Sequence, residues 1–517
     1  MRPTLLTLAL LLPALQAPAQ ELHRDRFASG VIRVEGKIQD CVLEDLDGDG
    51  RREMLLTHTV FGHDGAGTAT RYVSVKRLDP GSLDGKPEQS WVVPAEATVL
   101  FFGNYTAAPG GEIGYLCPTG AFVWERNGGG YNLQPRRLFE DSTFFDIPQE
   151  DSLPLWYWPF DIDGNGLPDF LLPRHGAYTL SLQTEPGVYG RSYRLQMPAA
   201  SRAEAGGAAW LRIVKALPRL ELQDVNGDFR TDLCLIWHDR FDYYLQGAEA
   251  TDAGSRATFP ETPSGSIQLV FLRQRELRNQ VATSITYLRD FNRGGGVDFL
   301  ASFTRGELAK VDAIATDYYM YLGTGGKELA ATTPNWRISL PGVSFNPQIQ
   351  DLDGDGFDDL VVSSFETSML SNAGKAVFQN IPVEYFVFLY NRATQTFSAE
   401  YDYRETVTVD IDRLGGGGGM PQLWFNGDWD GDGRKDILRL RSDGMLSAAR
   451  GISVNTLLRK APVDYEKTDL FRIGINDTDE KGEADPPAGV DIWEINGDGK
   501  ADLVLRWSGR VRVLLTR

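Results

Sequence analysis

The chain has 517 residues, with 52 Lys and Arg against 71 Asp and Glu, which gives a net charge of −19 at pH 7. Hydrophobic residues make up 42% of it, which is enough for a large buried core and excludes a chain that is disordered as a whole. The acidic balance, without clusters of Lys and Arg, argues against binding to nucleic acid or to an anionic membrane surface.

The N-terminus has the pattern of a secretory signal. Arg2 precedes the apolar run Leu5–Leu15, and Ala17-Pro18-Ala19 supplies a small-residue cleavage site. The run is shorter than the roughly 20 apolar residues that a membrane-spanning helix needs. We therefore predict that residues 1–19 are a signal peptide and that the protein is exported, to the periplasm, the cell surface or the medium. Residues 20–517 are predicted to form a single domain without membrane insertion.

A nine-residue acidic motif of the general form D-x-D-G-D-G-x-x-D recurs at intervals of about 60 residues, each time followed by an apolar run. The intact copies begin at Asp45, Asp161, Asp224, Asp351, Asp428 and Glu494. Two degenerate copies, 104–112 and 290–298, lie where the spacing requires them. The sequence therefore contains eight units of one repeat.

Each unit reads as four β-strands, because an alternating apolar run precedes the motif and up to three more strand-like runs follow it. This pattern predicts an all-β fold, a β-propeller of eight four-stranded blades, with seven blades as the alternative. The last unit lacks its outer strand, and the first has an extra strand-like run, Val31–Val34. We predict that this N-terminal strand joins the last blade and closes the ring, which removes open sheet edges.

The motif carries oxygen ligands at positions 1, 3, 5 and 9, with a backbone carbonyl at position 7. Glycines at positions 4 and 6 permit a tight turn with positive φ. Several oxygens without His or Cys suit Ca²⁺. An EF-hand is excluded because position 12, Leu56 or Val362, lies within a strand-like run. The predicted metal residues are Asp45, Asp47, Asp49, Arg51, Glu53, Asp161, Asp163, Asn165, Leu167, Asp169, Asp224, Asn226, Asp228, Arg230, Asp232, Asp351, Asp353, Asp355, Phe357, Asp359, Asp428, Asp430, Asp432, Arg434, Asp436, Glu494, Asn496, Asp498, Lys500 and Asp502.

The copies differ in how well they keep this pattern. Phe229 replaces the position 6 glycine in the copy at 224, and Gly294 replaces the position 5 ligand in the copy at 290. The copy at 104 has Thr106 and Ala108 at ligand positions and is expected to bind no metal. We predict about five or six structural Ca²⁺ ions in all.

These loops resemble the FG-GAP/VCBS repeats of integrin-α-like β-propellers, and the resemblance covers nearly all of residues 31–517. It implies calcium in the loop between the first and second strands of each blade. That family includes adhesion modules, lectin-like proteins and domains attached to enzymes. The count of eight units also resembles calcium-loaded rhamnogalacturonan lyases, which keeps an enzyme as an alternative.

A candidate ligand site lies on the face opposite to the acidic loops. His175 and His238 stand in the same register of two consecutive units, with Arg174, Asp239 and Arg240 as neighbours, and Arg305 lies one position further on in the next unit. This set could bind an anionic or hydroxyl-rich ligand; ordinary solvated hairpin tips are the alternative.

These features predict a monomeric binding or adhesion module for a glycan or protein ligand. The first alternative is a polysaccharide lyase that uses His175, His238, Arg174 and Arg240, because a lyase needs a base and a cation beside a uronate. The second is a structural or assembly protein of the cell envelope.

Overall fold

A computed structural model describes residues 24–517 except 63–68, 109, 144–152, 157–159, 175, 198–199, 206–210, 238, 252–253, 270–279, 308–309, 324–332, 366–379, 411–422, 442–443, 457–458 and 479–483. The predicted signal peptide lies outside the described residues, so it stays a prediction. No helix in the described part is long and apolar enough to cross a membrane.

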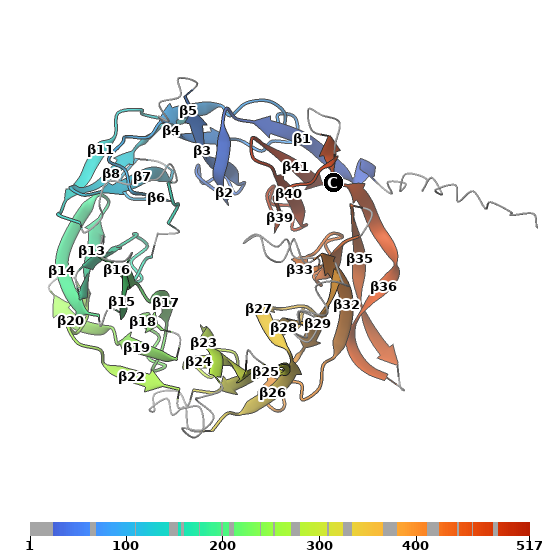
Figure 1. The fold of residues 1–517 in the computed structure, drawn as a ribbon. Helices are drawn as coiled ribbons and strands as arrows, with labels where there is room; N and C mark the ends of the chain where they lie inside the picture. The colour runs from blue at the N-terminus through green and yellow to red at the C-terminus, as the bar shows by residue number, and fades with distance from the viewer. Residues whose placement is uncertain are drawn as a thin grey trace, which may run out of the picture.

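The described strands form eight antiparallel blades arranged in a ring (Figure 1), which confirms the predicted eight-bladed propeller. From the inner to the outer strand, the first four blades are β2 (Lys37–Glu44), β3 (Glu53–Phe61), β4 (Ala69–Lys76) and β5 (Gln89–Val92); β6 (Val99–Gly103), β7 (Glu112–Cys117), β8 (Gly120–Trp124) and β11 (Arg136–Glu140); β12 (Phe170–Arg174), β13 (Ala177–Glu185) and β14 (Val188–Gln196), with the Phe160–Asp169 bridge at the innermost place; and β17 (Arg219–Gln223), β18 (Asp232–Ile236), β19 (Arg240–Tyr244) and β22 (Gly265–Gln268).

The other four blades follow the same order. They are β23 (Gln280–Arg289), β24 (Asp298–Glu307), β25 (Lys310–Tyr321) and β26 (Trp336–Pro341); β27 (Val343–Gln350), β28 (Asp359–Phe365), β29 (Asn380–Phe388) and β32 (Tyr403–Asp410); β33 (Leu423–Gly427), β34 (Asp436–Leu440), β35 (Met445–Thr456) and β36 (Arg459–Gly474); and β39 (Gly489–Trp493), β40 (Asp502–Arg506), β41 (Arg510–Thr516) and β1 (Phe27–Arg33).

Short elements decorate this ring. They are the 3₁₀ turn η1 (Arg24–Arg26) and the hairpins β9 (Arg126–Asn127) with β10 (Gly130–Tyr131), β15 (Ala200–Ala205) with β16 (Leu211–Ala216), β20 (Gly247–Thr251) with β21 (Gly254–Thr258), β30 (Tyr390–Asn391) with β31 (Thr396–Phe397), and β37 (Asp477–Thr478) with β38 (Ala484–Asp485).

The N-terminal strand closes the ring, as predicted. β1 pairs with β41 from Phe27↔Thr516 to Arg33↔Arg510, and Figure 1 shows the two strands side by side. The strand begins four residues before the predicted Val31, because Phe27 packs edge-on against Phe471 of the neighbouring blade, with ring centroids 4.9 Å apart. The closing blade is therefore built from both ends of the described chain.

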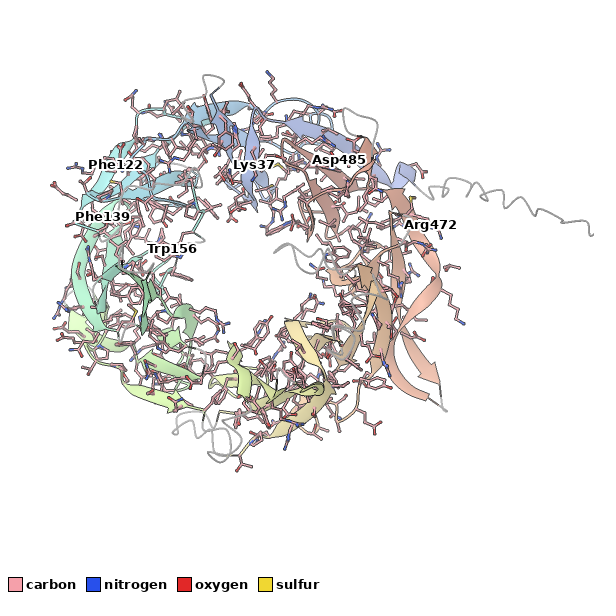
Figure 2. The ribbon with its side chains drawn as sticks, viewed as in Figure 1. Lys37, Phe122, Phe139, Trp156, Arg472 and Asp485 are labelled. Atoms are coloured by element: carbon pink, nitrogen blue, oxygen red, sulfur yellow. The ribbon has the colours of Figure 1, made fainter. Side chains whose placement is uncertain are left out.

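The core lies between neighbouring blades rather than within one. Phe101 of β6 packs edge-on against Phe170 of β12 at 5.3 Å, and Phe241 of β19 meets Phe299 of β24 at 5.7 Å. Figure 2 shows the side chains filling the spaces between adjacent sheets around the ring. Each blade thus buries its two apolar faces against its neighbours, which makes the ring a continuous scaffold.

Strand direction sorts the connections onto two faces. The loops between first and second strands, which carry the acidic motif, emerge together with the connections from third to fourth strands; we call this the motif face. The turns between second and third strands and the links from blade to blade emerge on the opposite face. We number the motif loops 1 to 8 after their blades.

Candidate metal centres and the opposite face

The position 1 carboxylate of the intact motifs organises the backbone of its own loop. In loop 6, Asp351 accepts the N–H groups of Gly354 at 2.8 Å, Asp355 at 3.1 Å and Gly356 at 2.8 Å. The two glycines have φ of 75° and 86°, a region that L side chains rarely adopt. The sequence folds locally in this way because a short acidic side chain followed by these glycines satisfies the turn's own donors.

The position 9 carboxylate is buried and fixes the loop to the sheet. In loop 6, Asp359 accepts the N–H of Leu352 at 2.9 Å through one oxygen and that of Tyr390 in β30, just after the third strand, at 2.8 Å through the other. Burial raises the pKa of this carboxyl to about 8. Burial also raises the pKa of Asp169, Asp298, Asp436 and Asp502 to about 7. A nearby cation would favour the charged form of these groups.

In four loops three carboxylates converge, with one oxygen of each within 4.8 Å of the others. These trios are Asp45, Asp47 and Glu53; Asp161, Asp163 and Asp169; Asp351, Asp353 and Asp355; and Asp428, Asp430 and Asp436. Convergent carboxylates without His or Cys fit a hard cation such as Ca²⁺ better than a transition metal.

Loop 1 contains an oxygen that its own contacts leave unsatisfied. Asp47 Oδ2 accepts hydrogen bonds from Arg126 of the next blade at 2.9 Å and from Arg77 at 3.2 Å. Its Oδ1 atom is buried and has no hydrogen-bond partner. A buried acceptor without a partner is costly, and a bound cation would satisfy it. The residues present therefore fit the predicted ion.

Loops 4 and 8 bring no such trio together among the described residues. At position 3 they carry amides, and Asn226 Nδ2 donates to Asp228 at 3.3 Å while Asn496 Nδ2 donates to Asp498 at 3.2 Å. The degenerate loop 2 differs more, because the Thr106 hydroxyl donates to the fully buried Glu112. In loop 5 the N–H of Gly294 donates to Asp290 at 2.9 Å.

The motif loops are hydrogen-bonded to one another. The N–H at position 8 of one loop donates to a carbonyl at position 2, or in one case position 1, of the neighbouring loop. These bonds are Gly111 to Leu46 at 2.7 Å, Arg52 to Ile495 at 3.0 Å, Ala501 to Asp428 at 2.7 Å and Lys435 to Leu352 at 3.1 Å. They join loops 2, 1, 8, 7 and 6 in sequence and cross the seam where the two chain ends meet.

On the opposite face, the three candidate arginines are each bound to a carboxylate of their own or the adjoining blade. Arg174 pairs with Asp141, Arg240 lies 3.3 Å from Asp242, and Arg305 donates to Asp317 at 3.0 Å. Asp239 accepts a hydrogen bond from Gln268 at 2.9 Å, and His175 and His238 lie outside the described residues. Within the described part, nothing joins these arginines into one cluster, so the ligand site remains a prediction.

Sequence reasoning missed one candidate functional residue, because it interpreted the residue only as a departure from the metal-binding motif. Phe229, at position 6 of loop 4, is 92% exposed and has a φ of 63°. Its departure from glycine is visible in the sequence, but the direction in which its side chain points is not.

Comparison with protein-family models finds no match, and comparison with curated protein sequences finds none either. The chain is similar to the solved structure of an Agrocybe aegerita lectin that recognises non-reducing terminal N-acetylglucosamine: 13% identity, TM-score 0.37, with 93% of this chain and 95% of that chain covered.

Two further solved structures are similar over most of this chain. They are the Photorhabdus luminescens Tc holotoxin pore (10% identity, TM-score 0.21, 94% of this chain and 27% of that chain) and the Vibrio cholerae biofilm matrix protein Bap1 (13% identity, TM-score 0.25, 92% and 76%). Because these scores are low, the class of the protein rests on its own geometry. It is an eight-bladed β-propeller with acidic loops on one face, and in four of these loops three carboxylates converge.

Proposed function

We propose that the protein is an exported, calcium-stabilised β-propeller that acts as a binding module for a glycan or protein ligand. The observation that supports it most is the convergence of three carboxylates in each of four motif loops, on a ring whose core lies between blades. Ca²⁺ bound there would neutralise these carboxylates and cross-link each loop. Asp351, Asp353 and Asp355 are the residues that would hold it in loop 6, and the equivalent trios would do so in loops 1, 3 and 7.

The same structure favours binding over lyase chemistry. A lyase needs a base and a free cation beside the substrate's carboxylate, and Arg174, Arg240 and Arg305 already face carboxylates of the protein. A scaffold that holds many loops rigidly on two faces is a common support for recognition.

Thermal unfolding in calcium and in EDTA tests the metal. We expect a higher midpoint in calcium, because an ion that binds only the folded state stabilises it by mass action. Asp353→Asn should reduce the calcium-induced shift. Thr106→Ala, in a loop expected to bind no metal, should leave that shift unchanged even if its midpoint falls. Equal midpoints in calcium and EDTA would contradict the proposal.

Binding itself is tested on a printed glycan array in the presence of calcium, together with an absorbance assay for the unsaturated product of uronate cleavage. We expect retention on a subset of glycans and no gain in absorbance. If the product forms and His238→Ala abolishes its formation, the protein is a lyase and the proposal of a binding module is wrong.

A further inference from the structure

Loop 4 carries a phenylalanine at a position where six other motif loops have glycine. Those glycines are Gly50, Gly166, Gly295, Gly356, Gly433 and Gly499, with φ between 80° and 88°. Phe229 has a φ of 63°, in the same left-handed region, and its N–H donates to Asp224 at 2.7 Å, just as Gly356 donates to Asp351 at 2.8 Å. Loop 4 therefore keeps the geometry of its relatives despite the side chain.

A side chain at this position points away from the protein. A Cβ atom at Gly50, Gly166, Gly295, Gly433 or Gly499 would meet no atom within 4 Å, and at Gly356 it would meet only Arg293 Nη2, at 3.5 Å. Phe229 follows that direction and is 92% exposed, whereas Phe61, another exposed phenylalanine, is 48% exposed. The ring thus adds little packing to the fold, and its backbone conformation is unfavourable for a bulky residue such as phenylalanine.

A strained residue that exposes a large apolar side chain without benefit to the fold suggests a function. We propose that Phe229 is a ligand-contacting residue on the motif face, whose ring stacks on the apolar face of a sugar unit. This inference rests on the proposed binding function and names its ligand class and contact residue.

The surroundings favour a glycan over an apolar protein or a membrane. The side chains beside Phe229 in its loop are polar: Asp228 and Arg230 lie 3.8 Å apart and partly exposed, and Asn226 donates to Asp228. A sugar ring combines one apolar C–H face with polar hydroxyl edges, which matches a single aromatic ring among hydrogen-bonding groups. Docking of an apolar partner would need a contiguous apolar patch of several hundred Å².

The two blades that follow blade 4 also have a non-glycine residue with positive φ. Among the described residues, the non-glycine residues with positive φ are Phe229, Arg293 and Gln395, which lie in blades 4, 5 and 6 and are all exposed. The Arg293 guanidinium lies over the ring of Phe357 at 4.5 Å, and Arg392 lies over that ring at the same distance. Both guanidinium groups also donate to backbone carbonyls of loop 6. The blades that follow blade 4 therefore expose polar and cationic side chains on the motif face.

The test uses the full exported chain on an array of oligosaccharides that contain hexose, N-acetylhexosamine and uronic acid units, with calcium present. Phe229→Gly should lose about tenfold in apparent affinity, because an aromatic contact is worth roughly one factor of ten. Its unfolding midpoint should not fall, since glycine suits the loop. Phe229→Trp should retain binding, Phe229→Leu should lose it, and Phe61→Ser on the opposite face should bind as the wild type does.

The possible failures are distinguishable. Glycan binding by Phe229→Gly within twofold of wild type would overturn the role of Phe229 and leave the binding module intact. Binding of Phe229→Leu equal to wild type, or Phe229-dependent binding only to vesicles of phosphatidylcholine and phosphatidylserine (3:1), would overturn the stacking on sugar in favour of an apolar contact. A wild-type protein that binds neither probe would overturn the proposed glycan-binding function together with this inference.

Discussion

Asp502 should stabilise the ring even without metal. It begins β40 in the closing blade, and its side chain is fully buried. One carboxylate oxygen accepts the N–H of Ile495 in the motif loop at 2.9 Å, and the other accepts the N–H of Thr516 in β41 at 2.7 Å. Because β41 pairs with β1, this carboxylate connects loop 8 to the strand pair that closes the ring.

Asp502→Ala removes both acceptors and leaves two buried N–H groups unsatisfied. Each such loss costs about 1–3 kcal/mol, so we expect the free energy of unfolding to fall by about 2–6 kcal/mol. Asp502→Asn keeps the volume and one acceptor, and should lose roughly half as much.

Urea unfolding in EDTA measures this effect apart from any ion. The matched control is Asp498→Ala, which removes an acceptor of the exposed Lys500 N–H, at 2.8 Å, from the same loop. We expect the control to change stability by less than about 0.5 kcal/mol in EDTA. If Asp502→Ala also unfolds within that margin of wild type, the structural role assigned to position 9 is wrong.

Two further predictions concern the first blade and the seam. His58 is buried, with Nδ1 2.8 Å from the Glu35 carbonyl and Nε2 2.9 Å from the Ser74 hydroxyl, and burial lowers its pKa. The unfolded state therefore binds a proton first, so stability should fall as pH drops below about 6.5, measured as the unfolding midpoint in calcium. Gly30→Ala should loosen β1, measured by faster hydrogen exchange there, because its Cβ would lie 2.6 Å from the Leu83 carbonyl carbon.

Each of these has a control. His58→Gln should flatten the fall in midpoint between pH 7.5 and 5.5, and an equal fall in both proteins would contradict the role of His58. Gly81→Ala should leave exchange in β1 unchanged, since a Cβ there meets no atom within 4 Å. If Gly30→Ala exchanges like this control, β1 does not pack as closely as the structure indicates.

The spacing of the motif was sufficient to predict the blades, because one acidic turn and one apolar strand recur in every unit. Counting strands was sufficient to predict the closure, although the start of β1 depends on the packing of Phe27 against Phe471, which no local pattern contains. The prediction that Arg174, Arg240 and Arg305 form one ligand site did not take into account the carboxylates that pair with them. The Arg240-x-Asp242 pair could have been recognised, since alternate residues of a strand share a face.

Other features depend on geometry that the sequence does not express. The two oxygens of the Asp502 carboxylate accept N–H groups from separate parts of the chain, Ile495 in the motif loop and Thr516 in β41. In the sequence, Phe229 indicates only that loop 4 departs from the metal-binding pattern. The loop nevertheless keeps its conformation, because a residue in the left-handed region costs only about 1–2 kcal/mol. Whether such a side chain is buried or displayed follows from the direction of the Cβ atom, which only the fold determines.

Among the described residues, the hydrogen bonds between motif loops join one part of the ring and leave another part unjoined. Loops 6, 7, 8, 1 and 2 are joined by backbone hydrogen bonds across the seam, and Arg293 extends this series to loop 5 by donating to the Gly356 carbonyl. Loop 3 cannot donate the corresponding bond to loop 2, because its position 8 is Pro168, which has no N–H. Ions held in loops 1, 6 and 7 would therefore act on the part of the ring that both chain ends must close. Phe229 stands in loop 4, so ligand contact there and closure of the ring should be separable by mutation.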